Sequence, residues 1–479
     1  MGYAVGMWWC WTLLACSGGP SPDPGPDGGS GSDTATDASP EEIPVAWSVA
    51  EAPHAGNVFQ LDWTPSDRLD QLTVRIDDEV FVWDDPVPPL SLMGLPPGRA
   101  ALAELTGPGG ATSDALAFPT AEVPAPLRSL VLEEASADSE AGQGWVLTNV
   151  YERDPASGYA LILDGQGRPV WWKEAPDALK SVRARLSHDG TAVVWAVTDW
   201  ELDDDIALIG RTSLDGRTEA LRAAPGLHHD VLEDGDRYHY LAFQVDESLP
   251  FGFNDAFPAV ADVVRSVPVA ADTPVEEGFA FFDDYPFPPY EACSHADFPS
   301  FHPTGVEWTH SNSLVTAPQG GLYVMARYLD ALVHVDAEGA FAWQIGGRDA
   351  TLHPVDPAHE AFHGHFTHAW DDRVLVFDNH SHVDGPSRVM EWRIDAAAGT
   401  YEAVWTHEEP GGGKITFLGD ARRMPGGHTL IAWSPRGELE EVRPDGTTAW
   451  RVDSPVLVTG RVAFEPGLPF ARPAAAPTP

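Results

Sequence analysis

A short unit recurs along most of this chain, and it constrains the fold more than any other feature. Each copy has a strand-like run, a turn that begins with Asp and contains Gly, and a second run that ends in a large apolar residue. Five aspartates open these turns, roughly 50 to 60 residues apart except for one gap of about twice that: Asp164, Asp215, Asp336, Asp395 and Asp445. The long gap predicts a degenerate copy that includes residues 263–282.

Repeats of this length predict a β-propeller. Each four-stranded sheet of such a fold has two apolar faces that only neighbouring sheets can cover, and ring closure hides most sheet edges. The 44 Pro and 45 Gly among 479 residues favour many turns and few long helices. Counting the degenerate copy, we expect an all-β protein with a six-bladed propeller over residues 126–465.

The segments beside the repeats differ from them in pattern. Residues 45–125 alternate apolar and polar positions in short runs separated by Pro, Gly and Asp, which predicts a small β-sandwich. We interpret it as a spacer or interaction module. The tail, residues 466–479, has no periodicity and is expected to be disordered.

The N-terminus resembles the signal of a bacterial lipoprotein. The first sixteen residues are largely apolar and end in Leu-Leu-Ala-Cys, which predicts a signal peptide over residues 1–15 and lipidation of Cys16. Residues 16–44 are rich in Ser, Gly, Pro and Asp and should form a disordered tether. We therefore expect a protein anchored by lipid in the bacterial cell envelope, at the outer membrane and facing either the periplasm or the surface. Cys293 is then the remaining cysteine, expected to be packed.

Charge limits the partners of this protein. The formal net charge is −45 at pH 7, which repels phosphate backbones and argues against nucleic-acid binding. Many of the 18 histidines fall between His295 and His382, with another pair at His228 and His229. Propellers bind ligands around the central channel, so this clustering predicts a functional site there.

Three stretches carry recognisable motifs in a fixed order. They are EWTHSNSL at 307–314, the run from FHGHFTHAW to FDN and SR at 362–388, and the run from LGD to GGHTL at 418–430. Together they resemble the PAPS-independent bacterial arylsulfotransferases. The resemblance implies that channel histidines move a sulfuryl group from a phenolic sulfate donor to a phenol acceptor, through a transiently sulfated histidine and without a cofactor.

The resemblance also implies roles for single residues. His310 matches the histidine of the W-x-H-x-N-S motif, and His365 matches the histidine that precedes F-D-N; both are expected to bind the sulfuryl group and transfer protons. Arg388 is a candidate charge stabiliser. The resemblance places the sulfated histidine in the last blade, where this sequence offers His428 and His407, with His428 as the chosen candidate. The residues expected to bind substrate are Asn312, His368 and Asn379.

Two other functions stay open at this point. Residues 359–363 spell H-E-x-x-H, but Pro354, Pro357 and Gly364 leave little room for the helix that a zinc peptidase needs. A metal-dependent hydrolase or lyase could instead use a histidine set within the propeller: His310, His363, His365 and His368. The other alternative is a surface-binding propeller without catalytic activity.

Overall fold

The computed structural model describes residues 42–65, 69–152, 157–176, 179–198, 206–251, 257–270, 274–289 and 305–470. The predicted signal peptide, Cys16, Cys293 and nearly all of the tether lie outside these residues, so the structure does not bear on the predictions made for them. In the part of the chain that is described, no helix is long and apolar enough to cross a membrane.

Residues 42–119 form two sheets. The first has the order β1-β8-β7-β4-β5 with β9 beside β7, and the second has the order β2-β3-β6. Their bounds are β1 (Glu42–Ile43), β2 (Ala46–Glu51), β3 (Phe59–Thr64), β4 (Gln71–Ile76), β5 (Glu79–Asp84), β6 (Leu90–Leu92), β7 (Ala100–Thr106), β8 (Thr112–Ser113) and β9 (Leu116–Pro119). Alternate residues of both sheets, such as Leu61 and Val74, meet in one apolar core, as the period-two pattern requires.

Six sheets follow within the described residues, each with four or five strands. Three of them are built from β36 (Leu457–Glu465), β11 (Trp145–Glu152), β12 (Gly158–Leu163) and β13 (Pro169–Glu174); from β14 (Lys180–Leu186), β15 (Ala192–Thr198), β16 (Leu208–Ser213) and β17 (Glu219–Ala223); and from β18 (Leu227–Asp234), β19 (Arg237–Phe251), β20 (Phe257–Pro268) and β21 (Glu276–Ala280), with β22 (Val306–Glu307) beside β20.

The other three sheets use the C-terminal half of the chain. They are built from β23 (Ser311–Thr316), β24 (Leu322–Ala326), β25 (Ala331–Val335) and β26 (Phe341–Ile345); from β28 (Gly364–Trp370), β29 (Arg373–Asp378), β30 (Arg388–Asp395), β31 (Thr400–Glu408) and β27 (His353–Pro354); and from β32 (Asp420–Arg423), β33 (Thr429–Trp433), β34 (Glu438–Val442), β35 (Thr448–Asp453) and β10 (Val131–Ala135).

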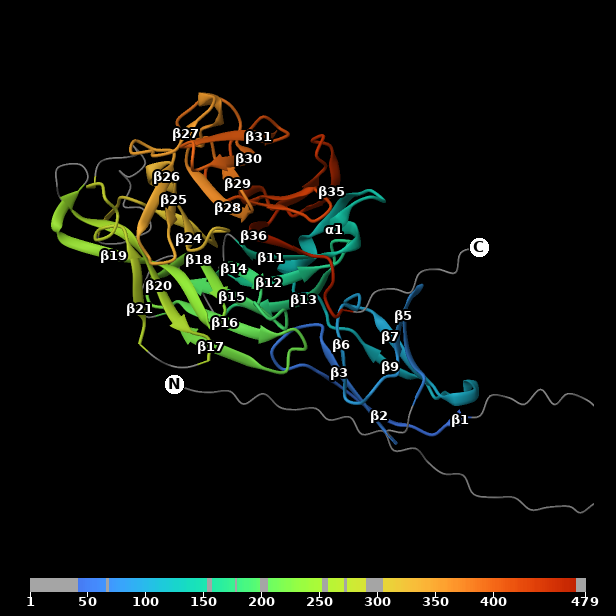
Figure 1. The fold of residues 1–479 in the computed structure, drawn as a ribbon. Coiled ribbons are helices and arrows are strands. Elements are labelled where there is room, and N and C mark those ends of the chain that lie inside the picture. Colours follow the sequence, from blue (N-terminus) through green and yellow to red (C-terminus); the bar gives the residue numbers. More distant parts are fainter. Residues whose placement is uncertain are drawn as a thin grey trace, which may run out of the picture. The chain divides into compact units, whose positions relative to one another are not determined.

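The first strand of each sheet contacts the first strand of the next. These inner strands form a closed ring in the order β14, β18, β23, β28, β32 and β36, and β36 contacts β14 again. Both ends of this part of the chain close the ring, because β36 pairs with β11 and β10 pairs with β35 (Figure 1). The arrangement confirms the predicted all-β class and brings the beginnings of the inner strands together.

The Asp-Gly turns lie where the repeat predicts them. In five of the six ring sheets of the described residues, the aspartate lies at or just after the end of the third strand, before the fourth, and its carboxylate accepts a backbone N–H two or three residues further on. The degenerate copy over 263–282 corresponds to β20 and β21, which form the outer strands of the β18 sheet.

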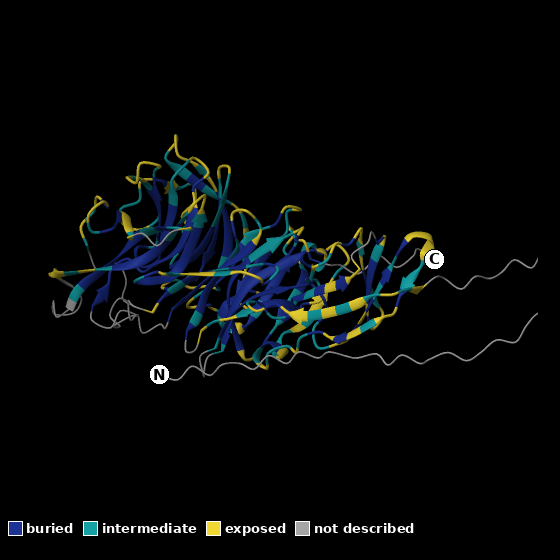
Figure 2. Cartoon of the chain, turned by 90° about the horizontal axis from the view of Figure 1, so that it is seen from below, coloured by how far each residue is buried: buried dark blue, intermediate teal, exposed yellow. Residues whose placement is uncertain are grey.

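The core lies between neighbouring sheets. Strands such as β11 and β15 are buried on both faces along nearly their whole length, and Figure 2 shows this part of the chain in dark blue with exposed residues mainly on the connecting loops. Large side chains including Trp171, Trp195 and Trp433 are fully buried. This packing fixes the inner strands and therefore the side chains that they carry.

Candidate active site

Three histidines from different sheets meet at the beginnings of the inner strands. His229 lies in β18, His310 directly precedes β23, and His365 lies in β28. The ring centroid of His229 is 4.9 Å from that of His310 and 6.1 Å from that of His365. All three side chains are buried. We call these residues the three-histidine cluster.

The backbone is strained at two members of the cluster. His229 has φ of 55° and His310 has φ of 46°, a left-handed conformation that residues other than glycine rarely adopt. At His229 the strain coincides with a register shift between β18 and β19. Strain of this kind persists only where the surrounding structure enforces it, and it concentrates at functional sites.

The imidazole of His310 is held in one orientation. Its Nδ1 bonds to the buried carboxylate of Glu307, and its ring stacks on Tyr328 with a centroid separation of 4.6 Å. Burial lowers the pKa of His310 well below its usual value, and the charge of Arg327 acts in the same direction. The ring is therefore neutral at pH 7, and its Nδ1–H donates a hydrogen bond to the carboxylate of Glu307.

His365 is oriented through its Nδ1 atom. This atom lies 3.1 Å from the carbonyl oxygen of Gly419 and 3.3 Å from Nη1 of Arg461. The carbonyl oxygen of Gly419 can only accept and is the nearer partner, which favours the proton on Nδ1 and the lone pair on Nε2; in this tautomer Nη1 of Arg461 contacts Nδ1 without a hydrogen bond between them. Burial, followed by the charge of Arg461, lowers the pKa of His365 well below its usual value. A neutral imidazole with Nε2 as its basic atom results.

A second line of groups supports the cluster from β18 and β20. Nδ1 of His228 is 2.8 Å from Nδ1 of His229, and Nε2 of His228 is 3.0 Å from Oδ1 of Asp262. The other oxygen of Asp262 accepts from the hydroxyl of Thr309 and the backbone N–H of Ser311. The pKa of Asp262 lies below its usual value. Burial alone would raise it, but the hydrogen bonds from His228, Thr309 and Ser311 together lower it by more. Asp262 therefore remains ionised and fixes both neighbours of His310.

Arg461, in β36, is the cation beside His365. Its side chain is buried, its Nη2 donates to the backbone carbonyl of Asn312, and its backbone N–H donates to Oδ1 of Asn149 at 2.8 Å. Burial lowers the pKa of Arg461 to about 10, so the guanidinium stays protonated at neutral pH. A small cavity next to it is lined by residues that include His229, His365 and Tyr151.

The asparagines expected to bind substrate lie close to the cluster but are engaged in backbone contacts. Asn312 is fully buried, and its Nδ2 is 3.4 Å from the carbonyl oxygen of Gly364. Nδ2 of Asn379 donates to the carbonyl oxygens of Ile415 and Leu418. Asn379 thus positions the loop that ends at Gly419, the residue that accepts from His365.

Arg388 and His368 lie apart from the three-histidine cluster. Nε of Arg388, at the beginning of β30, is 2.9 Å from Asp378, and its Nη2 donates to the carbonyl oxygen of Glu360. His368 is three residues further along β28 than His365, and its Nδ1 accepts from the backbone N–H of Arg423. Arg461 contacts His365 and the charge of Arg327 acts on His310, whereas the contacts of Arg388 are with Asp378 and Glu360.

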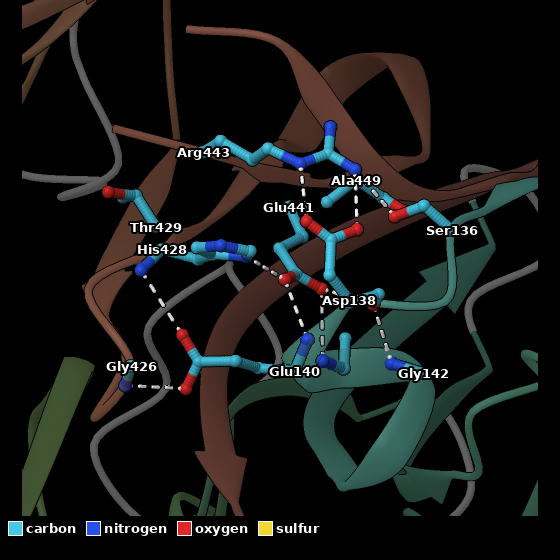
Figure 3. Close-up of polar contacts among 12 residues, drawn as sticks. Ser136, Asp138, Glu140, Gly142, Gly426, His428, Thr429, Glu441, Arg443 and Ala449 are labelled. Atoms are coloured by element: carbon cyan, nitrogen blue, oxygen red, sulfur yellow. Dashed lines mark hydrogen bonds and ion pairs between the residues drawn. The ribbon is translucent and has the colours of Figure 1, made fainter. Parts of the chain in front are cut away.

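His428 lies at the other end of β32 from Gly419 and does not join the cluster. Its Nδ1 is 2.5 Å from Oε1 of Glu441, and its backbone N–H donates to Glu140 (Figure 3). The carboxylate of Glu441 also accepts from Ser139 and from two N–H groups at the start of the short helix α1 (Glu140–Gln143). We call His428, Glu441, Ser139 and Glu140 the helix clasp, because they tie α1 to the β32–β35 sheet.

The described residues show neither the helix expected of the H-E-x-x-H motif nor a metal-binding arrangement of the alternative histidine set. Residues 357–359 form one short 3₁₀ turn and β28 begins at Gly364, so no α-helix carries both histidines of H-E-x-x-H. Nε2 of His363 lies 2.9 Å from Nε2 of His382. Within the described ranges, no group of three or more His, Cys, Asp or Glu residues is arranged to hold a metal ion.

Sequence reasoning noticed the His228–His229 pair but assigned it no role, and it did not single out Arg461, Asp262 or Tyr328. The signal for His229 was its place in Leu-His-His-Asp at a strand start. Arg461 offered no local signal, since Gly-Arg-Val-Ala-Phe reads as an ordinary strand. Arg461 reaches His365 because β36 pairs with β11 and closes the ring of inner strands.

Comparisons with known proteins gave similar solved structures and one matching family model. No curated protein matches the chain. Solved structures that are similar include a periplasmic gluconolactonase from Pseudomonas aeruginosa (15% identity, 83% of this chain and 99% of that chain, TM-score 0.36) and a streptogramin B lyase (12% identity, 71% and 90%, TM-score 0.35). A protein of unknown function from Bacteroides thetaiotaomicron is also similar (11% identity, 87% and 98%, TM-score 0.37).

The sequence model of one family covers most of the chain. It is described as Arylsulfotransferase (ASST), and it matches residues 132–432, from β10 to β33. That range contains all three members of the three-histidine cluster. The protein therefore belongs to the arylsulfotransferase (ASST) family.

Proposed function

We propose that this protein transfers a sulfuryl group from a phenolic sulfate ester to a phenol acceptor at the three-histidine cluster. Membership of the arylsulfotransferase family supports the reaction class and phenolic small-molecule substrates. The observation that carries the proposal is the convergence of His310 and His365 on His229, from three different sheets. Imidazoles suit this reaction because a neutral ring can attack sulfur and a neighbouring ring can accept a proton.

The first half-reaction uses His365 as the nucleophile. The lone pair of Nε2 attacks sulfur, an N–S bond forms, and the bond between sulfur and the phenolic oxygen breaks, so that its electron pair leaves with the phenolate. The lowered pKa of His365 keeps the ring neutral and competent to attack. His428 is a poorer nucleophile candidate, since its Nδ1 is bound to Glu441 at the opposite end of β32.

The second half-reaction restores the enzyme. The acceptor phenol gives its proton to His310, its oxygen attacks sulfur, and the electron pair of the N–S bond returns to Nε2 of His365. The carboxylate of Glu307, bonded to Nδ1 of His310, stabilises the imidazolium that this proton transfer creates. The proton then passes to solvent or to the next leaving phenolate.

Arg461 supplies charge to the transition state. The transferred group carries negative charge on its oxygens, and a preorganised guanidinium in a buried site stabilises that charge strongly. Arg461 is protonated, buried and 3.3 Å from His365. These properties support it in the role that the sequence had suggested for Arg388.

The experiment is an assay of nitrophenol release from p-nitrophenyl sulfate with a phenol acceptor. We expect His365→Ala and His310→Ala to abolish release, and the exposed His353→Gln to retain it as a matched control. Mass spectrometry of wild type incubated with donor alone should find one added sulfuryl group on the peptide that contains His365. Full acceptor-dependent release in both alanine variants, with thermal unfolding unchanged, would reject the proposal and favour a binding propeller.

Export and lipid anchoring at the cell envelope form a separate proposal, supported by the first sixteen residues of the sequence. Its test is the fractionation of cells that express the wild type or Cys16→Ser. We expect the wild type in the membrane fraction and the variant outside it. Equal distribution of wild type and variant between the fractions would contradict lipid anchoring at Cys16.

A further inference from the structure

Beyond the three-histidine cluster, the inner strands bring together a group of guanidiniums and carboxylates. The four arginines and the three acidic residues near them are Arg183, Arg185, Arg422, Arg461, Asp230, Asp420 and Glu465. Three of the guanidiniums, those of Arg183, Arg422 and Arg461, lie 4.5 to 5.1 Å from the ring centroid of Phe366. Four guanidiniums with three carboxylates near them form a local balance opposite in sign to the net charge of −45 of the chain.

The ion pairs within this group are loose. Nε of Arg183 is 3.4 Å from Oδ1 of Asp230, its Nη1 is 4.0 Å from Oδ2 of Asp420, and Nη2 of Arg185 is 3.6 Å from Oδ1 of Asp230. Within the described residues, the buried atoms Nε and Nη1 of Arg183 and Nε of Arg185 have no hydrogen-bond partner. The side chain of Arg183 is only 1% exposed. Since buried N–H groups are nearly always bonded, these atoms require an acceptor.

The unpartnered groups border the channel rather than the outer surface. Arg183 and Arg185 both stand on β14, an inner strand of the ring, and their side chains are 1% and 13% exposed. Arg185 and Arg422 stand later in their inner strands than His365 stands in β28. The charge of Arg422 acts on Arg185, and the guanidinium of Arg422 lies 4.5 Å from the ring centroid of Phe366, the residue that follows His365.

We propose that Arg183, Arg185 and Arg422 form a binding site for a small inorganic oxyanion, such as sulfate or phosphate, in the channel beyond Phe366. Planar guanidinium groups present paired donors that match two oxygens of an oxyanion, and they bind such anions better than halides of spherical shape. The strongly acidic surface repels anions elsewhere, which makes occupancy of the channel selective. The site does not depend on the proposed sulfuryl transfer, since it uses none of the three histidines.

A crystal soaked in sodium selenate tests the location. Selenate is a tetrahedral sulfate analogue, and selenium gives an anomalous signal. We expect an anomalous peak within hydrogen-bond distance of Arg185 and Arg422 in both wild type and His365→Ala. A peak confined to His365 and Arg461, or no peak in the channel, would overturn the proposal.

A solution experiment tests affinity. The melting temperature is followed against sodium sulfate, with sodium chloride at equal ionic strength as the reference, because sulfate also stabilises proteins by exclusion from their surface. We expect a saturating, sulfate-specific shift in wild type and in the exposed-arginine control Arg348→Gln. In Arg185→Gln and in Arg422→Gln, the apparent affinity should fall about tenfold, the loss of one charge-assisted hydrogen bond.

Two variants guard against a folding defect. If Arg185→Gln unfolds, Arg422→Gln carries the comparison, and its unfolding in chloride alone reports its basal stability. Equal sulfate shifts in wild type and in a folded variant would contradict the site. Nitrophenol release by wild type without added sulfate tests the proposed transferase function separately. Failure of one proposal therefore does not affect the test of the other.

Discussion

Nη1 of Arg461 lies 3.3 Å from Nδ1 of His365, although 96 residues separate the two in the chain. The contact exists because β36 returns to pair with β11 and takes its place in the ring of inner strands beside β32. The strand that closes the ring thus also supplies the cation of the candidate active site. Ring closure and the proposed catalysis are therefore linked through one side chain.

Replacement of Arg461 tests that coupling. We expect Arg461→Met to lower kcat/KM for p-nitrophenyl sulfate by about 10²- to 10³-fold, as for the loss of a preorganised charge at a transition state. Arg461→Lys should recover part of the loss, because an ammonium keeps the charge but not the planar fork. Steady-state kinetics measure both effects, with thermal unfolding as the control for folding. Wild-type kinetics in a folded Arg461→Met would show that this guanidinium does not act on the reaction.

The pH dependence follows from the lowered pKa values of the cluster. Burial lowers the pKa of His229, His310 and His365, so each imidazole is neutral at pH 7 and becomes protonated only below the usual value of about 6.5. Neutral His365 is the attacking form, so kcat/KM should hold as pH falls from 7 through the usual histidine pKa of 6.5 and decline only at lower pH. A pH–rate profile on folded protein measures this. A decline centred above pH 6.5 would contradict a buried, neutral nucleophile.

Much of the fold could be predicted because the repeat is local. The turns opened by Asp164, Asp336 and Asp445 depend on hydrogen bonds between residues two to four apart, and such short patterns are legible in one sequence. Even the degenerate copy had strand character where β20 and β21 form. The alternation of apolar residues also indicated the strands before residue 120.

The site was predictable only in part, because its members meet through topology. His310 and His365 stood in recognisable motifs, and the structure brings both to His229. His428 and Arg388 stood in equally plausible motifs, but both lie away from the three-histidine cluster. His428 contacts Glu441, and Arg388 contacts Asp378. Which end of an inner strand a residue occupies, and which strand closes the ring, depend on contacts between distant segments that spacing does not report.

The helix clasp gives a prediction that separates stability from catalysis. His428→Ala removes one bond to Glu441 and should lower the free energy of unfolding by about 1 kcal/mol while nitrophenol release stays near wild type. Glu441→Ala should cost about 3 kcal/mol or more, since it leaves Ser139 and the N–H groups of Glu140 and Ala141 without their acceptor. Urea unfolding measures both. Loss of release in folded His428→Ala would restore His428 as a catalytic candidate.

Gly419 links backbone geometry to the orientation of His365. Its φ is +106°, which strains any side chain, and a Cβ atom would lie 2.3 Å from Cε1 of Phe377 in the core. Its carbonyl oxygen accepts from Nδ1 of His365. We expect Gly419→Ala to destabilise the protein by about 2 to 4 kcal/mol and to lower kcat, because the loop must move and the imidazole loses its partner.

The matched control for Gly419 is Gly412→Ala. Gly412 also has positive φ, +69°, but nothing lies within 4 Å of its Cβ position, so only the conformational cost of about 1 kcal/mol should appear, with kcat unchanged. Urea unfolding and steady-state kinetics on both variants separate the two contributions. If Gly419→Ala lowered stability without lowering kcat, the carbonyl of Gly419 would have no part in setting the tautomer of His365, and the assignment of Nε2 as the attacking atom would lose its structural basis.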